Sequence, residues 1–288
     1  MEAYTGFAEV YDLFMDNIPY EQWAQYVIKL LEENGINAQI ENPTIVDLGC
    51  GTGTFTQILN DAGFQMIGID NSQEMLMIAN GKRFENNNEY EESEECEESE
   101  EYEESEEYEE SEECEESDEY QNSKSIIYTL QDMRDFAVPE PVSAIVSVCD
   151  SMNYIIEEAE LSEVFKCVKN ALAENGVFVF DMKTQHFFRD ILGENTIAEN
   201  RVNAAFIWDN YYYEDESINE YQMTLFIEEE NSLFRKYEET HVQRGYTIEE
   251  VKASLAVAGL EIVNIFDAFT QNSPTDNSER IYFVVKRK

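Results

Sequence analysis

The sequence predicts an α/β protein built around a mostly parallel sheet. Short runs rich in β-branched residues alternate along the chain with amphipathic segments of helical length, which implies crossover connections between parallel strands. A glycine-rich loop joins the first of these runs to the segment after it, at the point where an open parallel sheet binds nucleotides. The chain has 288 residues, a length that permits one large domain or two small ones, and its hydrophobic fraction of 43% is enough for a substantial core.

The elements of the first half follow from hydrophobic spacing and from helix start and stop residues. After Pro19, apolar residues at helical spacing from Trp23 to Leu31 predict a helix that ends near Gly35. Asn71 and Glu74 have the spacing of a capping box, which starts another helix. In chain order, the elements expected after the first helix are the strand Thr44 to Leu48, the helix Thr54 to Ala62, the strand Met66 to Asp70, the helix Asn71 to Ala79, the strands Ile126 to Leu130 and Ala144 to Val148, the helix Glu157 to Ala173 with a stop near Gly176, and the strand Val177 to Asp181.

The pattern changes after Lys183. Three segments rich in aromatic and β-branched residues predict antiparallel strands joined by polar turns, namely Phe206 to Trp208, Glu220 to Ile227 and Arg235 to Val242. We therefore expect an antiparallel β subdomain over residues 183–245, inserted after the fifth strand of the main sheet. A capping box at Thr247 and Glu250 then starts a helix that ends near Gly259, and two strands follow, Glu261 to Phe266 and Ile281 to Lys286.

Residues 86–122 form an acidic segment that repeats Glu-Glu-X, where X is Ser, Tyr or Cys. Like charges at this density oppose compaction, so we expect a disordered insertion. A tolerated surface insertion is the first interpretation, and a cation-binding or partner-binding tail is the alternative. Removing the 21 acidic residues of positions 89–119 from the net charge of -45 leaves -24, so the rest of the chain is also acidic.

This charge disfavours nucleic acid and membrane surfaces as partners, because both are anionic. No apolar run is long enough to span a bilayer, and the first residues are polar rather than a signal peptide, so a cytoplasmic location is expected. The five cysteines contain no CxxC pair and the chain has only two histidines, so neither a disulfide framework nor a metal site is expected.

The glycine loop has the sequence Gly49-Cys50-Gly51-Thr52-Gly53, and glycine lets a backbone approach a ligand closely. No lysine follows at the spacing of a phosphate-binding loop, which disfavours a nucleoside triphosphate. Asp47 stands two residues before the loop. Its carboxylate would repel the pyrophosphate of a dinucleotide but would attract the ammonium and sulfonium groups of S-adenosyl-L-methionine (SAM).

Asp70 ends the second strand, 17 residues after Gly53. A carboxylate at this place can accept hydrogen bonds from both hydroxyls of a ribose. It supports an adenosine without choosing between SAM and NAD, and a simple helix N-cap is its alternative role.

Several segments together resemble the class I SAM-dependent methyltransferases. Val46 to Gly53, Asp70 to Ser72 and Met75-Leu76 resemble the cofactor motifs of that family, Gln131 to Arg134 its adenine-contacting turn, and Val148 to Tyr154 its active-site rim. Tyr4, Tyr11-Asp12 and the antiparallel insertion resemble the branch with sugar N-methyltransferases and glycine N-methyltransferase. The resemblance covers the chain except residues 86–122. It implies a single Rossmann-like domain over residues 1–288 with a doubly wound, seven-stranded sheet.

The resemblance also implies which residues bind SAM. The glycine loop would hold the methionine part, Asp47 would support its amine, Asp70 would bind the ribose, and Tyr11 would close over the sulfonium. Ordinary packing is the alternative role for the tyrosines. The full set of implied cofactor-binding residues is Tyr4, Tyr11, Asp47, Gly49, Cys50, Gly51, Gly53, Asp70, Asn71, Met75, Asp132, Met133, Cys149 and Asp150.

The signals for catalysis are less specific. Methyl transfer needs in-line alignment, and it needs a base only where the acceptor is protonated. His241 is the candidate base, because its strand is expected to face the cofactor, and a packing role is the alternative. His186 is a weaker candidate, beside two phenylalanines. The candidate substrate contacts are Asn153, Tyr154 and Arg244.

The leading interpretation is SAM-dependent transfer of a methyl group to a nitrogen or oxygen of a small molecule, by a monomer or homodimer. Two alternatives stay open, an NAD-dependent oxidoreductase and a non-catalytic SAM-binding module. The charge of Asp47 argues against the first, and the intact loop with both acids argues against the second.

Overall fold

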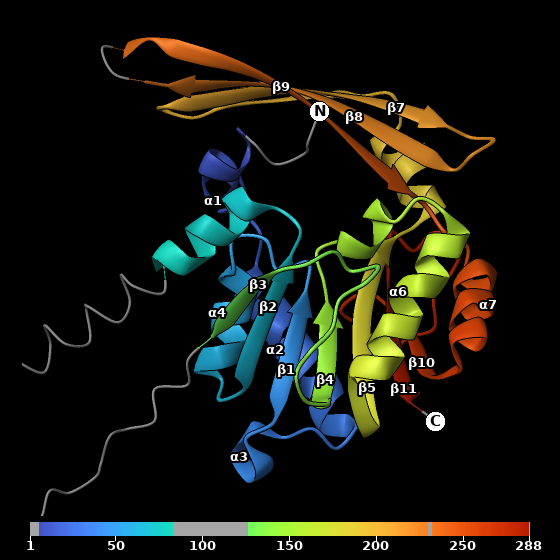
Figure 1. Ribbon diagram of the computed structural model, residues 1–288. Helices are drawn as coiled ribbons and strands as arrows, with labels where there is room; N and C mark the ends of the chain where they lie inside the picture. The colour runs from blue at the N-terminus through green and yellow to red at the C-terminus, as the bar shows by residue number, and fades with distance from the viewer. Residues whose placement is uncertain (1–5, 83–125, 230–231, 288) are drawn as a thin grey trace, which may run out of the picture.

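The computed structural model describes residues 6–82, 126–229 and 232–287, so Tyr4 and the acidic segment 86–122 lie outside the described residues. A seven-stranded sheet of order β10-β11-β5-β4-β1-β2-β3 forms the body of the molecule (Figure 1). Its strands are β1 (Thr44–Leu48), β2 (Gln65–Asp70), β3 (Ile127–Leu130), β4 (Val142–Ser147), β5 (Leu172–Lys183), β10 (Leu260–Asp267) and β11 (Arg280–Arg287). The seven-stranded α/β architecture expected from the sequence is confirmed.

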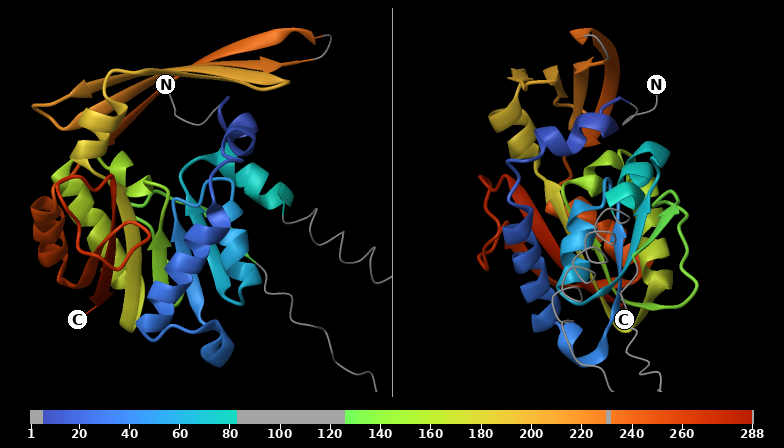
Figure 2. Two further views of the ribbon diagram at one scale, coloured as in Figure 1. Left: turned by 180° about the vertical axis from the view of Figure 1, so that it is seen from behind. Right: turned by 90° about the vertical axis from the view of Figure 1, so that its left-hand side faces the viewer.

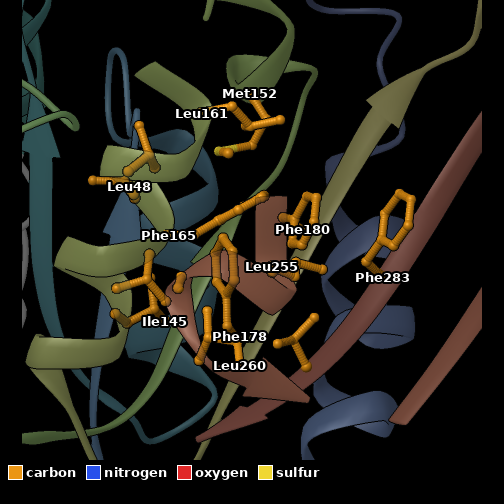
Figure 3. Close-up of a cluster of buried hydrophobic side chains, with 14 of the residues drawn as sticks. Leu48, Ile145, Met152, Leu161, Phe165, Phe178, Phe180, Leu255, Leu260 and Phe283 are labelled. Atoms are coloured by element: carbon orange, nitrogen blue, oxygen red, sulfur yellow. The ribbon is translucent and has the colours of Figure 1, made fainter. Parts of the chain in front are cut away.

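Helices cover both faces of this sheet, so two separate cores form. The α-helices are α1 (Tyr11–Phe14), α2 (Tyr20–Glu33), α3 (Ala38–Glu41), α4 (Thr54–Asp61), a helix over residues 73–82, α6 (Glu158–Ala171) and α7 (Ile248–Ala258). On one face, Phe165 of α6 and Leu255 of α7 pack with Phe178 and Phe180 of β5 (Figure 3). On the other face, α2 and α4 pack over the alternate residues of the same strands. This arrangement is the doubly wound topology.

The direction and order of the strands place a crevice at their carboxyl ends, next to the central strand β1. β1 pairs in parallel with both β2 and β4. Within this sheet β11 alone runs opposite to the other six strands. In the sheet, β2 and β3 follow on one side of β1, whereas β4 and β5 follow on its other side. The strand order therefore reverses between β1 and β4. Ligands of open α/β sheets bind at the carboxyl ends of the strands at such a switch point.

A second sheet, which we call the cover sheet, lies across the carboxyl ends of the main strands (Figures 1 and 2). It has the antiparallel order β6-β7-β8-β9. Its strands are β6 (Thr196–Asn200), β7 (Ala204–Tyr213), β8 (Ile218–Glu228) and β9 (Phe234–Arg244). The expected β insertion is thus present. The strand β6 and the π-helix Phe187–Leu192 were not predicted, because both are short and neither has a clear periodicity.

The first described residues lie between the two sheets (Figure 2). A 3₁₀ helix, Ala8–Val10, and α1 form a strap, which we define as residues 6–14. Phe7 and Phe14 of the strap are buried against Phe206, Met223 and Leu225 of the cover sheet. Phe14 meets Phe206 edge-to-face, with ring centroids 4.8 Å apart. The strap is therefore anchored to the cover sheet by apolar packing.

Several helix ends differ from the predictions by one or more residues. The helix predicted from Asn71 begins at residue 73, and its capping group is the Ser72 hydroxyl, which accepts from the Met75 amide. The Asp70 carboxylate accepts a hydrogen bond from the Ser72 N–H, so the first turn of the helix begins after Ser72. α6 ends at Ala171 rather than at Ala173, because the chain is already extended from Leu172. The predicted capping box of Thr247 and Glu250 on α7 is confirmed.

Within the described part of the chain, no helix combines the length and the apolar character that crossing a membrane requires.

Candidate functional site

Two cavities lie at the carboxyl ends of the main strands, and the second of them extends to the cover sheet. Each has a volume of about 570 Å³, within the range of small-molecule sites. The first, the loop cavity, is lined by the glycine loop and by residues that follow β2, β3 and β4. The second, the cover cavity, is lined by the strap, the cover sheet and the loop before β11. Four residues line both cavities and so form their boundary, namely Tyr11, Tyr20, Cys149 and Tyr154.

The glycine loop needs its glycines for backbone conformation and for space. Gly49, Gly51 and Gly53 have φ angles of 81°, 54° and 76°, which side chains disfavour. A Cβ on Gly49 would stand 2.7 Å from the Ser151 side chain, whereas a Cβ on Gly51 would have no protein atom within 4 Å. Gly51 thus faces open space in the loop cavity. Gly53 lies behind the cavity rather than on its wall, where a Cβ would collide with the Tyr128 hydroxyl.

Asp47 is a buried carboxyl group in the wall of the loop cavity. The Thr56 hydroxyl donates to its Oδ2 at 2.6 Å. Burial raises the pKa of Asp47 to about 7, although the Thr56 bond opposes the shift, and the nearby Asp70 adds to it. Near neutral pH a buried carboxyl group with this pKa is partly protonated, and a cation bound beside it favours the ionised form. The site therefore suits a ligand with an ammonium group.

Asp70 closes the loop cavity from the side of β2. Its Oδ2 accepts from the Gly51 N–H at 2.8 Å and its Oδ1 accepts from the Ser72 N–H at 2.9 Å. Burial raises its pKa, and these backbone donors limit the shift. The carboxylate therefore fixes the glycine loop as well as lining the cavity. Asn71 and Met75 line the cavity beside it, as the resemblance implied.

The turn after β3 supplies the far wall of the loop cavity. Asp132 and Met133 both line it. Arg134 donates from its Nε to Asp132 Oδ1 at 2.9 Å, and this bond lowers the pKa of Asp132. The same guanidinium reaches Glu160 of α6 at 2.8 Å. The acid is thus fixed as a carboxylate, oriented to accept hydrogen bonds at the cavity wall.

His241 lies on the wall of the cover cavity and is buried, with 3% of its surface exposed. Its Nδ1 is 3.2 Å from the Tyr154 hydroxyl and its Nε2 is 3.1 Å from Glu239 Oε2. Glu239 lies two residues earlier on β9, on the same side of the strand, and is also buried. The structure therefore brings two of the predicted site residues, His241 and Tyr154, into one hydrogen-bonded group with an acid that the sequence reasoning missed.

A charged cluster crosses the floor of the cover cavity. Asp150 contacts Lys183 at 3.0 Å and Arg280 at 2.9 Å, and Arg280 also contacts the buried Asp181 at 2.6 Å. Burial alone would raise the pKa of Asp150, but Lys183 and Arg280 hold it below its ordinary value. The cluster is internally neutral. Of the two cavities, Asp150 lines the cover cavity only, and its contact with the cofactor stays a prediction.

Two predicted substrate contacts line neither cavity. The Asn153 side chain is fully buried and bonds to the backbone of Lys183 and Arg244, so it joins β5 to β9. Arg244 donates to the Ile156 carbonyl and pairs with Glu158 and Glu250. In the structure both side chains help to hold the cover sheet on the main sheet, and their contact with a substrate stays a prediction.

The remaining predicted residues divide as follows. Gly49, Cys50 and Gly51 line the loop cavity, and Tyr11 and Cys149 stand at the boundary. His186 lines neither cavity and pairs with Asp190 at 2.8 Å in the π-helix.

Sequence reasoning missed further residues of the cover cavity. These include Tyr20, Gln243 and Arg280. Glu239, which bonds to His241 but does not line the cavity, was also missed. For Glu239 the only available signal was its alternation with His241 on one strand, and for Arg280 there was none.

The comparison with known families decides what this arrangement is. Residues 15–265 match the family model described as a methyltransferase domain. The chain belongs to this family. It is 28% identical over 285 residues to YqeM of Bacillus subtilis, a presumed methyltransferase, over 99% of this chain and 97% of YqeM. A presumed methyltransferase of a Geobacillus strain is 27% identical over 289 residues, over 99% of this chain and 100% of that protein.

Solved structures of methyltransferases have the same fold. An S-adenosylmethionine-dependent methyltransferase from Clostridium acetobutylicum superposes with a TM-score of 0.75 at 24% identity, over 99% of both chains. The sugar N-methyltransferase KedS8 from a Streptoalloteichus species superposes with a TM-score of 0.68 at 18% identity, over 97% of this chain and 93% of KedS8. At these identities the likeness shows the fold.

The methyltransferase is therefore a class I enzyme with SAM as its cofactor, and the alternative of an NAD-dependent oxidoreductase is excluded. The loop cavity fits this cofactor on its own features. Gly51 leaves open space beside the backbone, Asp47 offers a buried acid to an ammonium group, and Asp70 offers a carboxylate at the end of β2. No lysine or arginine lies on the glycine-loop side of the cavity among its lining residues, as expected for a ligand without phosphate.

Proposed function

We propose that this enzyme methylates a small molecule that binds in the cover cavity, on a nitrogen or an oxygen, with nitrogen favoured. The observation that supports this most is the boundary formed by Tyr11, Tyr20, Cys149 and Tyr154, where the two cavities adjoin. A cofactor in one cavity and an acceptor in the other would meet there, in line, without water between them.

The lining of the cover cavity favours an amine with an apolar body. Aromatic rings dominate its walls, including Phe7, Trp208 and Tyr221. The internal charge cluster is neutral, and Asp267 and Glu279 add carboxylates whose oxygens have no hydrogen bond or ion pair within the described residues. The remaining charge at this cavity is thus negative, which attracts an ammonium group and repels a phosphate or carboxylate.

The roles of the protein groups follow from their places. The bound cofactor supplies an activated methyl group on a sulfonium. Asp47 holds the ammonium end, Asp70 the ribose, and the turn of Asp132 the adenine. Tyr11 lines the boundary, where the face of an aromatic ring would stabilise a cation by about 1 kcal/mol. His241 takes up the proton that an amine acceptor must lose before it becomes a nucleophile.

Two fold neighbours support an acceptor that carries an amino group. KedS8 is a sugar N-methyltransferase, and CalS10 of Micromonospora echinaspora is an amino pentose methyltransferase whose structure holds SAM, with a TM-score of 0.64 at 15% identity. An amino sugar combines an ammonium group with a polar ring, which would use the carboxylates of the cover cavity. The acceptor class we propose is therefore a small primary or secondary amine.

The test is methyl transfer from labelled SAM to defined acceptors. Purified enzyme is incubated with a panel of paired amines and alcohols that share one carbon skeleton, and the products are located by mass spectrometry. We expect label on the nitrogen of at least one amine and on none of the matched alcohols. Label only on oxygen would overturn the preference for nitrogen, and label on neither, with SAM bound, would overturn the proposal.

We also propose that the enzyme works in the cytoplasm as a monomer or homodimer and takes no nucleic acid as substrate, which the formal charge of -45 supports.

A further inference from the structure

Tyr154, His241 and Glu239 form a continuous hydrogen-bonded row that begins at the boundary of the two cavities. The Tyr154 hydroxyl is 3.2 Å from His241 Nδ1, and His241 Nε2 is 3.1 Å from Glu239 Oε2. The row joins the 3₁₀ helix Ser151–Tyr154 after β4 to the strand β9. Of the three residues, only Tyr154 lines the loop cavity as well as the cover cavity.

The strap fixes the direction of the hydrogen bonds in this row. Glu239 Oε1 accepts from the N–H groups of Gly6 and Phe7 at 2.8 and 2.9 Å. Two backbone donors on one oxygen favour the ionised carboxylate. The ionised Oε2 can only accept, so His241 Nε2 carries the proton toward it. Nδ1 is then the unprotonated nitrogen of the neutral ring, and it accepts from the Tyr154 hydroxyl.

We propose that Tyr154 is the catalytic residue that contacts the acceptor, and that it relays the acceptor's proton to His241. This proposal rests on the proposed function, because it assumes a protonated amine at the boundary. The ammonium N–H gives its proton to the Tyr154 oxygen while the Tyr154 O–H gives its own to His241 Nδ1. The products are a neutral amine, an unchanged phenol and an imidazolium. Glu239 is a positioning residue, which holds the tautomer and pairs with the imidazolium.

Three other titratable groups adjoin the row. Tyr221 of β8 is the cross-strand neighbour of His241, and its hydroxyl donates to Gln243, at 2.6 Å. Gln243 in turn donates to Asp150, at 3.0 Å, which is paired with Lys183 and Arg280. Tyr11 stands at the boundary, and burial raises its pKa and that of Tyr221. These phenols therefore stay protonated, and Asp150 is already engaged by cations.

Nuclear magnetic resonance can read the tautomer directly, because the chain has only two histidines. The ¹⁵N signals of the imidazole rings are recorded in the full-length protein and in His186→Gln, which removes the signals of the other histidine. We expect the neutral His241 ring to be protonated at Nε2 and unprotonated at Nδ1. Tyr154→Phe should move the Nδ1 signal, and Glu239→Gln should change the tautomer. A neutral ring protonated at Nδ1 would overturn the relay.

Kinetics with two amine acceptors test the catalytic role. We expect Tyr154→Phe and His241→Gln each to lower kcat by about 100-fold for an amine that is protonated at the assay pH. The KM for the acceptor and the Kd for S-adenosylhomocysteine should stay near the wild-type values. For an amine that is already neutral at that pH, the loss should largely disappear, because no proton must be removed.

Tyr246→Phe is the matched control, because its buried hydroxyl donates to the Ile155 carbonyl and it lines neither cavity. It should keep the wild-type kcat. Full activity of Tyr154→Phe with the protonated amine, or an equal loss with both amines, would overturn the relay but not methyl transfer. Failure of the wild-type enzyme to methylate any amine would instead overturn the proposed function.

Discussion

The two cavities of this enzyme are built in different ways. The wall of the loop cavity comes mainly from four short segments around residues 47–55, 69–75, 130–134 and 148–155, each at the carboxyl end of a strand of one sheet. The cover cavity joins segments far apart in the chain, and the bond from Gly6 to Glu239 spans 233 residues. The shape of the loop cavity therefore depends on local backbone geometry, whereas the shape of the cover cavity depends on how distant elements pack.

This difference separates what is common to the family from what is particular to the enzyme. A glycine loop with two acids can hold the same cofactor wherever the fold places it at a switch point. The acceptor has to be recognised by side chains that the strap and the cover sheet bring together, such as Trp208 and Tyr154. Substitutions in the two cavities should therefore affect the two ligands separately.

The substitution Gly51→Ala should have the largest effect on the affinity for one ligand alone. A methyl group there enters open space in the loop cavity, and the left-handed φ adds about 1–2 kcal/mol of strain. We expect Gly51→Ala to weaken binding of S-adenosylhomocysteine by about 100-fold, equivalent to about 2.7 kcal/mol. Titration calorimetry measures this directly.

Gly35→Ala is the control for Gly51→Ala, because Gly35 also has a left-handed φ and open space but lines neither cavity. The two variants should lose similar stability, and only Gly51→Ala should lose affinity. Equal affinities in both would contradict the assignment of the loop cavity to the cofactor.

The ionisation of Asp47 should have a smaller effect on the affinity for the cofactor, and this effect should depend on pH. Its pKa of about 7 in the folded protein lies above its ordinary value of 3.8, so the ligand-free protein loses stability as the pH rises from about 4 through 7. An ammonium ligand needs the ionised form, so affinity for S-adenosylhomocysteine should rise through about pH 7. Calorimetry across this range should show a slope of up to tenfold per pH unit.

The variant Asp47→Asn isolates this carboxyl group, because it keeps the size and a hydrogen bond to Thr56. We expect its affinity for S-adenosylhomocysteine to be about tenfold lower at pH 8, where Asp47 is ionised, and to be nearly independent of pH. A variant with the wild-type slope would assign the dependence to another group.

Asn153 should affect stability but not binding of the cofactor. Replacement by alanine leaves the backbone groups of Lys183 and Arg244 without their buried partner, at a cost of about 3 kcal/mol. Denaturant unfolding of Asn153→Ala measures this. The control is Gln57→Ala, which should change stability little because Gln57 is partly exposed and bonds only across one helical turn to Asp61. Wild-type stability combined with weaker acceptor binding would instead support the predicted contact between Asn153 and the substrate.

The smallest effect should come from the acidic segment. We predict that deletion of residues 89–119 leaves the affinity for S-adenosylhomocysteine nearly unchanged, because the composition of the segment indicates a passive insertion. A tenfold loss, measured by the same calorimetry, would show that the segment supports the neighbouring adenine turn at Asp132.

The sequence predicted the sheet, its helices and most of the loop cavity, because those features follow from local patterns. Asp47, Gly51 and Asp70 lie within or beside one short motif, and their roles follow from strand ends and backbone freedom. The cover cavity could not be predicted in this way. Asn153 and Arg244 have polar side chains like those of a binding site, and only the packing of β9 against β5 shows that they hold backbone groups.

The central claim is that the methyl group crosses the boundary between the two cavities. A crystal structure of the enzyme with S-adenosylhomocysteine tests it most directly. We predict that the ligand fills the loop cavity, with its amino group at Asp47 and its sulfur facing Tyr154 and Cys149 at the boundary. A sulfur atom that faces solvent, or that is walled off from the cover cavity, would contradict the account.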